Sequence, residues 1–370
     1  MTTLTVDASR GAYDVIIASG ALGQLGGLCA SLLRGRRILL VADDALTASH
    51  ALSVATSLRE ANFDVSQTFI RAAEVRKSVE VVAQLWDAAM DAGLERNDAI
   101  VAVGGGLTGD VAGFAAATWL RGIDVIQVPT TLLAMVDASI GGKTGVNVPL
   151  PDTVGGGLGK NMAGAFWPPK LVLADPQTLS TLPERELRCG LAECVKHALL
   201  GDEALMTMLQ ASGPAIASGE LDDAASLISQ AVAVKARVVA EDEREAGSRA
   251  LLNLGHTFAH AIEGRPALDL HHGEAVSIGL VAAAHVGVAM ESFDEASLES
   301  LTTLLRAVQL PIELPGPAPA SELLQRMRFD KKVVDGTMRL VVPCTGGGAV
   351  IRDDVTHEQV LDAWRRVGAS

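Results

Sequence analysis

The stretch Asp98-Ala99-Ile100-Val101-Ala102-Val103, followed by Gly104-Gly105-Gly106-Leu107-Thr108-Gly109-Asp110, decides the fold. Its first part is a continuous apolar run, which is typical of a strand buried on both faces of a parallel sheet. The glycines let the backbone turn sharply after the strand, and the segment Val111 to Trp119 then has a helical pattern. A strand, a glycine-rich turn and a helix in this order predict an α/β fold with a parallel sheet.

The glycine-rich turn matches the pattern GxGxxG, and the free N–H groups at the start of the next helix suit a diphosphate. Two details depart from the usual dinucleotide-binding pattern. The motif lies about a hundred residues into the chain, and the following strand, Val125 to Val128, runs into Pro129-Thr130-Thr131 without an acidic residue. We favour a phosphate-bearing cofactor over a merely structural tight turn.

Strands and helices alternate over residues 1–175, which predicts a sheet with helices on both faces. Further strands are expected at 13–17, 37–42, 64–69 and 171–175, and further helices at 45–61 and 79–93. Residues 176–183 are the expected domain junction. Beyond Glu184 the pattern is mostly helical up to a terminal piece, Met338 to Pro343.

The composition excludes several classes of function. The formal charge of -14 argues against a general nucleic-acid surface. Four widely spaced cysteines fit reduced thiols, and the first residues lack the regions of a signal peptide. The apolar run from Ala275 to Met290 is shorter than a membrane span, so we interpret it as a buried helix of a soluble cytoplasmic protein.

Lysine is scarce, with eight lysines against twenty-two arginines, so we interpret the lysines that are present as serving specific purposes. For any single lysine, chance or a codon bias is an equal explanation. The sequence Gly141-Gly142-Lys143-Thr144 lacks the upstream glycine of a nucleoside-triphosphate loop, since Asp137 stands there. We interpret it, and a second stretch that ends at Lys160 and Asn161, as two flexible turns that present lysines to a small anion.

Four of the eight histidines fall within seventeen residues. His256 and His260 are four apart and share one helical face, and His272 returns from a later loop. Three imidazoles and a distant carboxylate are a possible set of ligands for one divalent ion, although a core histidine with two exposed ones is the alternative. Glu193 and Lys196 share a helical face too, either as a solvated ion pair or on a partly buried surface.

These blocks together resemble the 3-dehydroquinate synthase family, the sugar-phosphate cyclases of the shikimate pathway. The resemblance runs from about Asp43 to Pro343. Its strongest blocks are 104–147, 159–196, 251–263 and 272–276. It implies a Rossmann-like, NAD-binding α/β domain over residues 1–178 and a mostly α-helical metal- and substrate-binding domain over residues 179–370.

The resemblance also implies individual roles. One divalent metal ion, zinc or cobalt, would be held by Glu193, His256 and His272. With the glycine-rich turn included, the NAD site would comprise Asp43, Glu74, Lys77, Gly104, Gly105, Gly106, Gly109, Asp110, Thr130, Thr131, Lys143, Lys160, Thr178 and Thr181. The substrate would be contacted by Arg121, Asp137, Lys143, Lys160, Asn161, Lys196, Lys235, Arg249, Asn253, His260 and one of Lys331 or Lys332.

The implied reaction converts 3-deoxy-D-arabino-heptulosonate 7-phosphate into 3-dehydroquinate and phosphate. It proceeds by transient oxidation with NAD, phosphate elimination, reduction and an intramolecular aldol closure. His260 would face the phosphate of the substrate, and the enzyme would be a homodimer. Two features depart from the family pattern: the segment 148–159 is several residues longer, and Ala72 and Ala73 replace an acid and a glycine of the nucleotide loop.

Three other functions remain open from the sequence. The first is a related cyclase of secondary metabolism that acts on an amino analogue or another sugar phosphate. The second is a metal-dependent polyol dehydrogenase, which would share the fold and the glycine-rich turn. The third is a binding or scaffold protein without activity, against which the intact set of polar residues argues.

Overall fold

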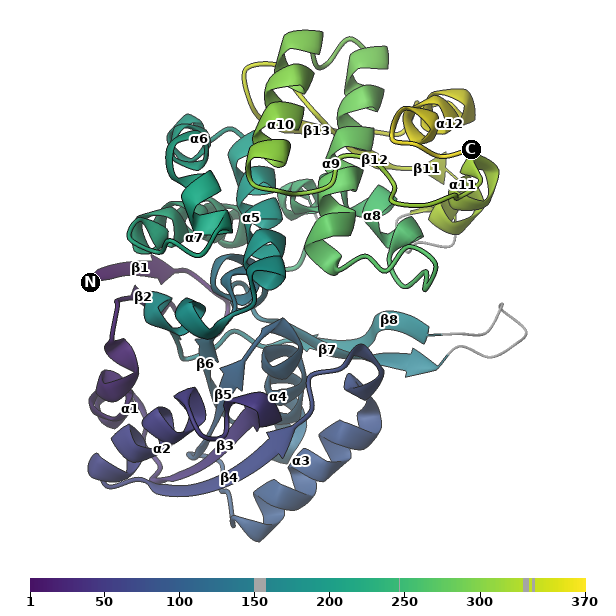
Figure 1. Ribbon diagram of the computed structural model, residues 1–370. Coiled ribbons are helices and arrows are strands. Elements are labelled where there is room, and N and C mark those ends of the chain that lie inside the picture. Colours follow the sequence, from purple (N-terminus) through teal and green to yellow (C-terminus); the bar gives the residue numbers. More distant parts are fainter. Residues whose placement is uncertain (150–157, 246, 329–332, 335–336) are drawn as a thin grey trace. The chain divides into compact units, whose positions relative to one another are not determined.

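The structure is a computed structural model that describes residues 1–149, 158–245, 247–328, 333–334 and 337–370. The chain forms two compact units (Figure 1). The first unit comprises Met1–Leu182 and Lys235–Glu243, and the second comprises Pro183–Val234 and Arg244–Ser370. Helix α7 (Ala224–Glu241) therefore contributes residues to both units.

The first unit is built on a seven-stranded sheet within the described residues, in the order β1-β2-β9-β6-β5-β3-β4. Neighbouring strands are parallel except for β1 and β2, which are antiparallel. The strands are β1 (Thr2–Val6), β2 (Tyr13–Ile17), β3 (Arg37–Asp43), β4 (Asp64–Ile70), β5 (Ala99–Gly104), β6 (Asp124–Pro129) and β9 (Leu171–Ala174). The predicted parallel α/β sheet is confirmed.

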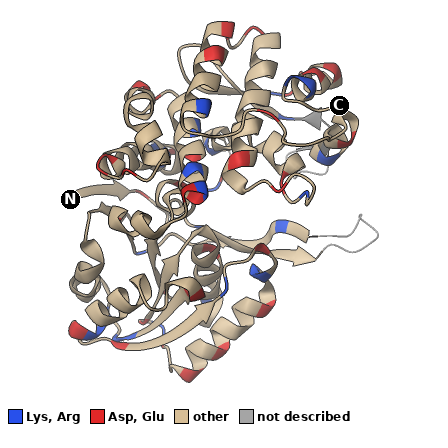
Figure 2. Cartoon of the chain, in the orientation of Figure 1, with Lys and Arg blue, Asp and Glu red and all other residues tan. Residues whose placement is uncertain are grey.

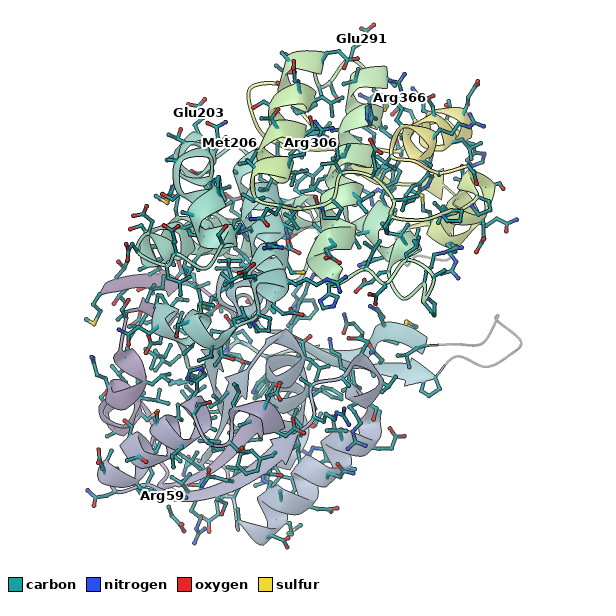
Figure 3. The ribbon with its side chains drawn as sticks, in the orientation of Figure 1. Arg59, Glu203, Met206, Glu291, Arg306 and Arg366 are labelled. Atoms are coloured by element: carbon teal, nitrogen blue, oxygen red, sulfur yellow. The ribbon has the colours of Figure 1, made fainter. Side chains whose placement is uncertain are left out.

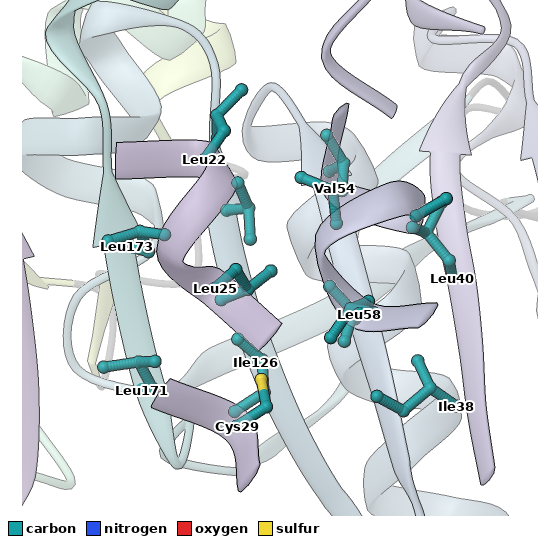
Figure 4. Packing of buried hydrophobic residues seen from close by; sticks show 14 of the residues in the cluster. Leu22, Leu25, Cys29, Ile38, Leu40, Val54, Leu58, Ile126, Leu171 and Leu173 are labelled. Atoms are coloured by element: carbon teal, nitrogen blue, oxygen red, sulfur yellow. The ribbon is translucent and has the colours of Figure 1, made fainter. Parts of the chain in front are cut away.

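Helices cover both faces of this sheet, because successive side chains of a strand point to opposite faces. The helices are α1 (Leu25–Leu32), α2 (His50–Glu60), α3 (Val79–Asp91) and α4 (Gly106–Thr118). Ile38 and Leu40 of β3 pack with α1 and α2 (Figure 4), whereas Leu39 and Val41 pack with α3 and α4. Figure 2 shows acidic residues along α3.

Two predicted helices begin elsewhere in the structure. The helix expected from Ala45 begins at His50, after a short 3-10 turn at Asp44–Leu46. The helix expected from Val111 begins at Gly106, inside the glycine-rich stretch. Glycine is a poor helix former, but a Cβ at Gly109 would lie 2.7 Å from Oε1 of Gln127 on β6. Close packing of α4 on the sheet therefore outweighs local propensity here.

The predicted positions of Lys143 and Lys160 on flexible turns are wrong, although Gly141 and Gly142 do turn the backbone just before Lys143, with φ values of 92° and 67°. Lys143 begins strand β7 (Lys143–Pro149), and Lys160 and Asn161 lie on strand β8 (Leu158–Phe166). The two strands pair antiparallel, with Lys143 opposite Phe166. The glycines suggested turns because glycine has a low local propensity for strands, which pairing between the two strands outweighs here. The additional residues 150–157 lie outside the described part of the chain.

The second unit is mostly helical. Its elements are α5 (Glu184–Leu199), α6 (Glu203–Ala217), α8 (His256–Ile262), α9 (His272–Ala289), α10 (Glu295–Ala307), α11 (Ala320–Arg328), β10 (Val333–Val334), β11 (Thr337–Met338), β12 (Leu340–Pro343), β13 (Ala349–Arg352) and α12 (His357–Arg366). Helix α9 is long and apolar enough to cross a membrane, but 72% of it is buried inside the protein, so it is a core helix. His272 is its first residue, which corrects the predicted loop position.

A cavity of about 370 Å³ lies at the far end of α9 and is lined by residues that include His285, Arg306 and Arg366. Figure 3 labels Arg306 of α10 and Arg366 of α12. His285 lies thirteen residues along α9 from His272, which is roughly 20 Å at the rise of an α-helix. This cavity is therefore separate from the histidine cluster described next.

Candidate active site

Three side chains of the second unit converge in the way that a metal ion requires. Oε1 of Glu193 lies 3.2 Å from Nε2 of His272 and 3.5 Å from Nε2 of His256. The three possible ligand atoms all lie within 4.8 Å of one another. One carboxylate and two imidazoles are a frequent zinc set, which leaves a coordination position open for substrate.

Each histidine is held through its other ring nitrogen. Nδ1 of His256 is 3.3 Å from the carbonyl oxygen of Leu254, and Nδ1 of His272 is 3.4 Å from Oε1 of Glu263. These contacts favour the tautomer in which Nδ1 carries the proton and Nε2 is available to a metal. Glu263 was not singled out from the sequence, because nothing local connects it with His272.

The two imidazoles differ in charge. Burial lowers the pKa of His256 to about 4, against the opposing charge of Glu193. Burial also acts to lower the pKa of His272, but its contacts with Glu193 and Glu263 outweigh this and raise the pKa to about 10. At neutral pH and without metal, His256 is neutral and His272 is protonated.

Close approaches between helices bring these side chains together. Gly255 precedes α8 with a φ of 79°, and a Cβ at Gly279 of α9 would lie 2.3 Å from the Gly255 carbonyl oxygen. A Cβ at Gly273 would lie 2.3 Å from the Cα of Cys189 on α5. Only glycine allows α8 and α5 to lie this near α9, so the ligands from three helices depend on these positions.

Some of the residues predicted to contact the substrate lie beside this cluster in the second unit. Lys196 Nζ lies 2.5 Å from Oε2 of Glu193, and both side chains are at most 2% exposed, so the pair is buried. The rings of His256 and His260 are 5.7 Å apart in an edge-to-face arrangement, as expected for one helical face. Nδ2 of Asn253 donates to Oε1 of Glu245 at 2.7 Å, a partner that the sequence did not suggest.

Residues predicted for NAD lie at the carboxyl ends of neighbouring parallel strands in the first unit. Asp43 ends β3, Gly104 ends β5 and Thr130 follows β6. The backbone N–H of Thr130 donates to the Gly104 carbonyl at 2.9 Å. Gly105 is the N-cap residue of α4, and Thr178 and Thr181 lie in a 3-10 turn after β9. This edge of an open α/β sheet is where ligands bind in such folds.

A partly buried polar network in the first unit joins residues predicted to bind the cofactor with residues predicted to contact the substrate. Lys77 Nζ contacts Oδ2 of Asp110 and Oδ1 of Asn161. Burial raises the pKa of Asp110, and the charge of Lys77 opposes that effect. Lys160 Nζ lies 3.9 Å from Oε1 of Glu74.

Asn147 completes this network, although it was not among the predicted site residues. Its Nδ2 donates to Oε1 of Glu74 at 2.7 Å, and its Oδ1 accepts from the backbone N–H of Asn161 at 2.8 Å. Asn147 is buried, and its own N–H donates to the Lys77 carbonyl. Its place at the end of the Gly-Gly-Lys-Thr stretch was the available signal.

The remaining predicted residues have distinct positions. Lys235 Nζ lies 2.8 Å from Oδ1 of Asp137, so these two form a pair in the first unit. Arg121 is exposed and has a φ of 71° in the turn after α4. Arg249 is buried in the second unit. Lys331 and Lys332 lie outside the described residues.

Comparison with known proteins identifies the family. A family model described as 3-dehydroquinate synthase N-terminal matches residues 67–189, and one described as 3-dehydroquinate synthase C-terminal matches residues 190–333. A 3-dehydroquinate synthase of Synechococcus sp. (strain CC9605) is 45% identical, over 99% of this chain and 100% of that protein. The chain belongs to the 3-dehydroquinate synthase family. Its function is that of this family, a lyase of the shikimate pathway.

Solved structures of other sugar-phosphate cyclases agree with this fold. The 2-epi-5-epi-valiolone synthase of Streptomyces hygroscopicus subsp. jinggangensis 5008, with NAD+ and Zn2+ bound, has a TM-score of 0.85 at 29% identity, over 96% of each chain. A 2-deoxy-scyllo-inosose synthase complexed with carbaglucose-6-phosphate, NAD+ and Co2+ has a TM-score of 0.86 at 24% identity, over 99% of this chain and 100% of that one. The second likeness shows the shared fold alone.

Proposed function

We propose that the substrate is 3-deoxy-D-arabino-heptulosonate 7-phosphate and that NAD and one zinc or cobalt ion act as cofactors. The observation that supports this most is the convergence of Glu193 Oε1 with the Nε2 atoms of His256 and His272. The ligand set matches the residues that the family resemblance implies for the metal. The structurally similar valiolone synthase is described with NAD+ and Zn2+, which supports the same pair of cofactors here.

The cofactors supply what side chains cannot. When bound, the metal ion acts as a Lewis acid on the substrate hydroxyl that is oxidised, and NAD accepts and later returns the hydride. The residues of the chain bind and orient. Oε1 of Glu193 faces the metal position while Oε2 holds the buried ammonium of Lys196. This pairing keeps Lys196 oriented at the edge of the site.

The polar and cationic residues divide between the two anionic groups of the substrate. We assign Lys143, Lys160, Asn161, Arg121 and His260 to the phosphate, and Lys235 and Arg249 to the carboxylate. Asp137 is positioned by Lys235, with 2.8 Å between Oδ1 and Nζ. Since the chain is acidic overall, with a formal charge of -14, local cations have to provide the attraction for a ligand that carries both a phosphate and a carboxylate.

The first unit holds NAD in this proposal. The N-terminal end of α4 would bind the diphosphate, because helix N-termini present free N–H groups and a positive dipole end. The network of Lys77, Asp110, Glu74 and Asn147 would fix the nearby surface. Asp43, Thr130 and Thr178 would line the carboxyl edge of the sheet.

A phosphate-release assay tests the proposal directly. The purified, metal-reconstituted protein should release phosphate from the heptulosonate phosphate with trace NAD, and a chelator or the removal of NAD should stop it. A polyol dehydrogenase would instead accumulate reduced nicotinamide, visible by absorbance, whereas no net NADH should form here. Full activity after removal of all metal would overturn the metal assignment.

One alternative substrate deserves the same assay because the valiolone synthase shares the fold closely. Turnover of sedoheptulose 7-phosphate without turnover of the heptulosonate would assign the chain to that activity instead. The 45% identity to a 3-dehydroquinate synthase, against 29% to the valiolone synthase, favours the heptulosonate. A homodimeric state and a cytoplasmic location remain part of the proposal, with gel filtration as the check on the first.

A further inference from the structure

A second cluster of metal-binding side chains lies one helical turn from the first, within the second unit. Glu186, Cys189 and His271 each offer one ligand atom, and these atoms lie within 4.8 Å of one another. Glu186 and Cys189 are three apart on α5 and share a face. Nδ1 of His271 lies 2.8 Å from Oε1 of Glu186. We propose that Glu186, Cys189 and His271 form a second divalent-metal site that takes a zinc-type ion.

The position of this cluster follows from the helix packing that builds the first site. His271 immediately precedes His272, and Cys189 lies one turn before Glu193 on α5. The two neighbouring histidines thus belong to different clusters. Gly273 allows the start of α9 to approach α5 at Cys189, where a Cβ would lie 2.3 Å from the Cys189 Cα. The same close approach therefore assembles both ligand sets.

The ligands of the second cluster are held in place by their surroundings. His271 is the N-cap residue of α9, and its backbone N–H donates to Oε2 of Glu274 at 2.8 Å. Arg185 binds both oxygens of Glu274 at 2.7 Å, so that carboxylate is already neutralised and Glu186 is the acidic ligand. Cys189 is buried, whereas the side chains of Glu186 and His271 are 42% and 38% exposed, so an ion can enter from their side.

The donor set selects the class of ion. A sulfur, an imidazole and a carboxylate together suit zinc or cobalt, whereas magnesium and calcium prefer oxygen ligands alone. A nucleophilic role for the thiol fits less well. Burial, with the charge of Glu186 in addition, raises the pKa of Cys189 to about 12, so the thiol is protonated in the absence of metal. A coordinating ion displaces that proton to solvent as it forms the metal–sulfur bond.

A cobalt(II) titration of the metal-free full-length protein distinguishes the two sites by their ligands. The Glu193 cluster has only nitrogen and oxygen donors, so cobalt bound there gives no thiolate-to-cobalt charge-transfer band in the near ultraviolet. We expect two equivalents of cobalt per chain by equilibrium dialysis, with the band rising during one of the two. In Glu193→Gln, the cobalt equivalent that gives no charge-transfer band should be lost. This variant therefore tests the proposed catalytic metal separately from the second site.

Variants identify the residues that bind the second equivalent of cobalt. Cys189→Ala should remove the band and one equivalent, while Cys344→Ala should keep both, because Cys344 belongs to no such cluster among the described residues. His271→Asn and Glu186→Gln should weaken the same equivalent; asparagine retains a good N-cap for α9, and both positions tolerate change because they are partly exposed. These two variants decide the question if Cys189→Ala does not fold. Three results would overturn the proposal. The first is that the unaltered protein binds only one equivalent of cobalt, and the second is that the second equivalent gives no charge-transfer band. The third is that the band survives in these variants.

Discussion

Glu193 and Lys196 form a buried ion pair in which Oε2 lies 2.5 Å from Nζ, while Oε1 of the same carboxylate faces His256 and His272. One carboxylate therefore serves a cation and a metal position at once. Because both side chains are almost fully excluded from solvent, neither charge has water as an alternative partner. Replacement of Glu193 consequently affects both stability and metal binding.

Glu193→Gln should lose one equivalent of bound metal per chain and show no measurable phosphate release. It should also lower the free energy of unfolding by about 3–5 kcal/mol, because the buried ammonium of Lys196 loses its counter-charge. Metal analysis and denaturant unfolding measure the two effects. Glu184→Gln is the control on the same helix, since Glu184 pairs with Arg188 at the surface. Normal metal content in Glu193→Gln would contradict the ligand assignment.

Glu263→Gln should weaken metal binding roughly 10–100-fold while the fold stays intact, because outer partners of ligating histidines have effects of this size. Glu263 Oε1 contacts Nδ1 of His272 and so orients its Nε2 toward Glu193. Competition with a chromophoric chelator measures the affinity. Glu299→Gln, an exposed carboxylate on α10, should bind metal as the unaltered protein does. Equal affinities in the two variants would remove Glu263 from the site.

Zinc binding at the Glu193 cluster should release one proton near pH 7. His272, with a pKa of about 10, is protonated there and must lose its proton, whereas His256, with a pKa of about 4, is already neutral. The apparent zinc affinity should therefore rise about tenfold per pH unit between pH 5 and 9. Calorimetry in two buffers of different ionisation enthalpy, on the Cys189→Ala variant, counts the protons from this site. Identical heats in both buffers would contradict the protonated state of His272.

Asn147→Ala should weaken NAD binding and destabilise the first unit by about 1–3 kcal/mol, because the buried Asn147 side chain makes hydrogen bonds to Glu74 and to the Asn161 N–H that alanine cannot make. Fluorescence titration with NADH and thermal unfolding measure the two effects. Asn97→Ala, at an exposed position of the same unit, is the control. Unchanged NADH affinity together with the expected loss of stability would restrict Asn147 to a structural role.

Gly273→Ala should destabilise the second unit by about 1–3 kcal/mol and weaken metal binding, because the new Cβ would displace the start of α9 from the α5 backbone at Cys189. Gly316→Ala is the matched control, since its Cβ would make only ordinary van der Waals contacts, 3.6 Å from a methyl group of Leu268 and 3.7 Å from the Ala267 carbonyl oxygen. Metal content and thermal unfolding, measured side by side, separate the two variants. If the two variants had the same stability and the same metal content, α9 would accommodate the new methyl group without loss of either.

Several features of this protein could be predicted from short stretches of sequence. The apolar run at 99–103 and the alternation around it predict a parallel sheet, because strand and helix periodicities are local properties. The four-residue spacing of His256 and His260 places both rings on one helical face for the same reason. The family motifs predicted the ligand set Glu193, His256 and His272, which the structure brings together.

Other features depend on packing between residues that are far apart in the sequence. The start of α4 at Gly106 and the strands β7 and β8 contradicted the local expectation. Packing against Gln127 in the first case, and pairing with the next strand in the second, outweigh glycine's weak propensity. Asn147 meets Glu74 across 73 residues, and the second cluster joins His271 to Glu186 across 85. The sequence by itself determined most of the elements that form and which residues can bind a metal. Only the tertiary structure decided which of them meet, because hydrogen bonds and coordination require atoms within a few ångströms, and that proximity is set by the packing of whole helices and strands.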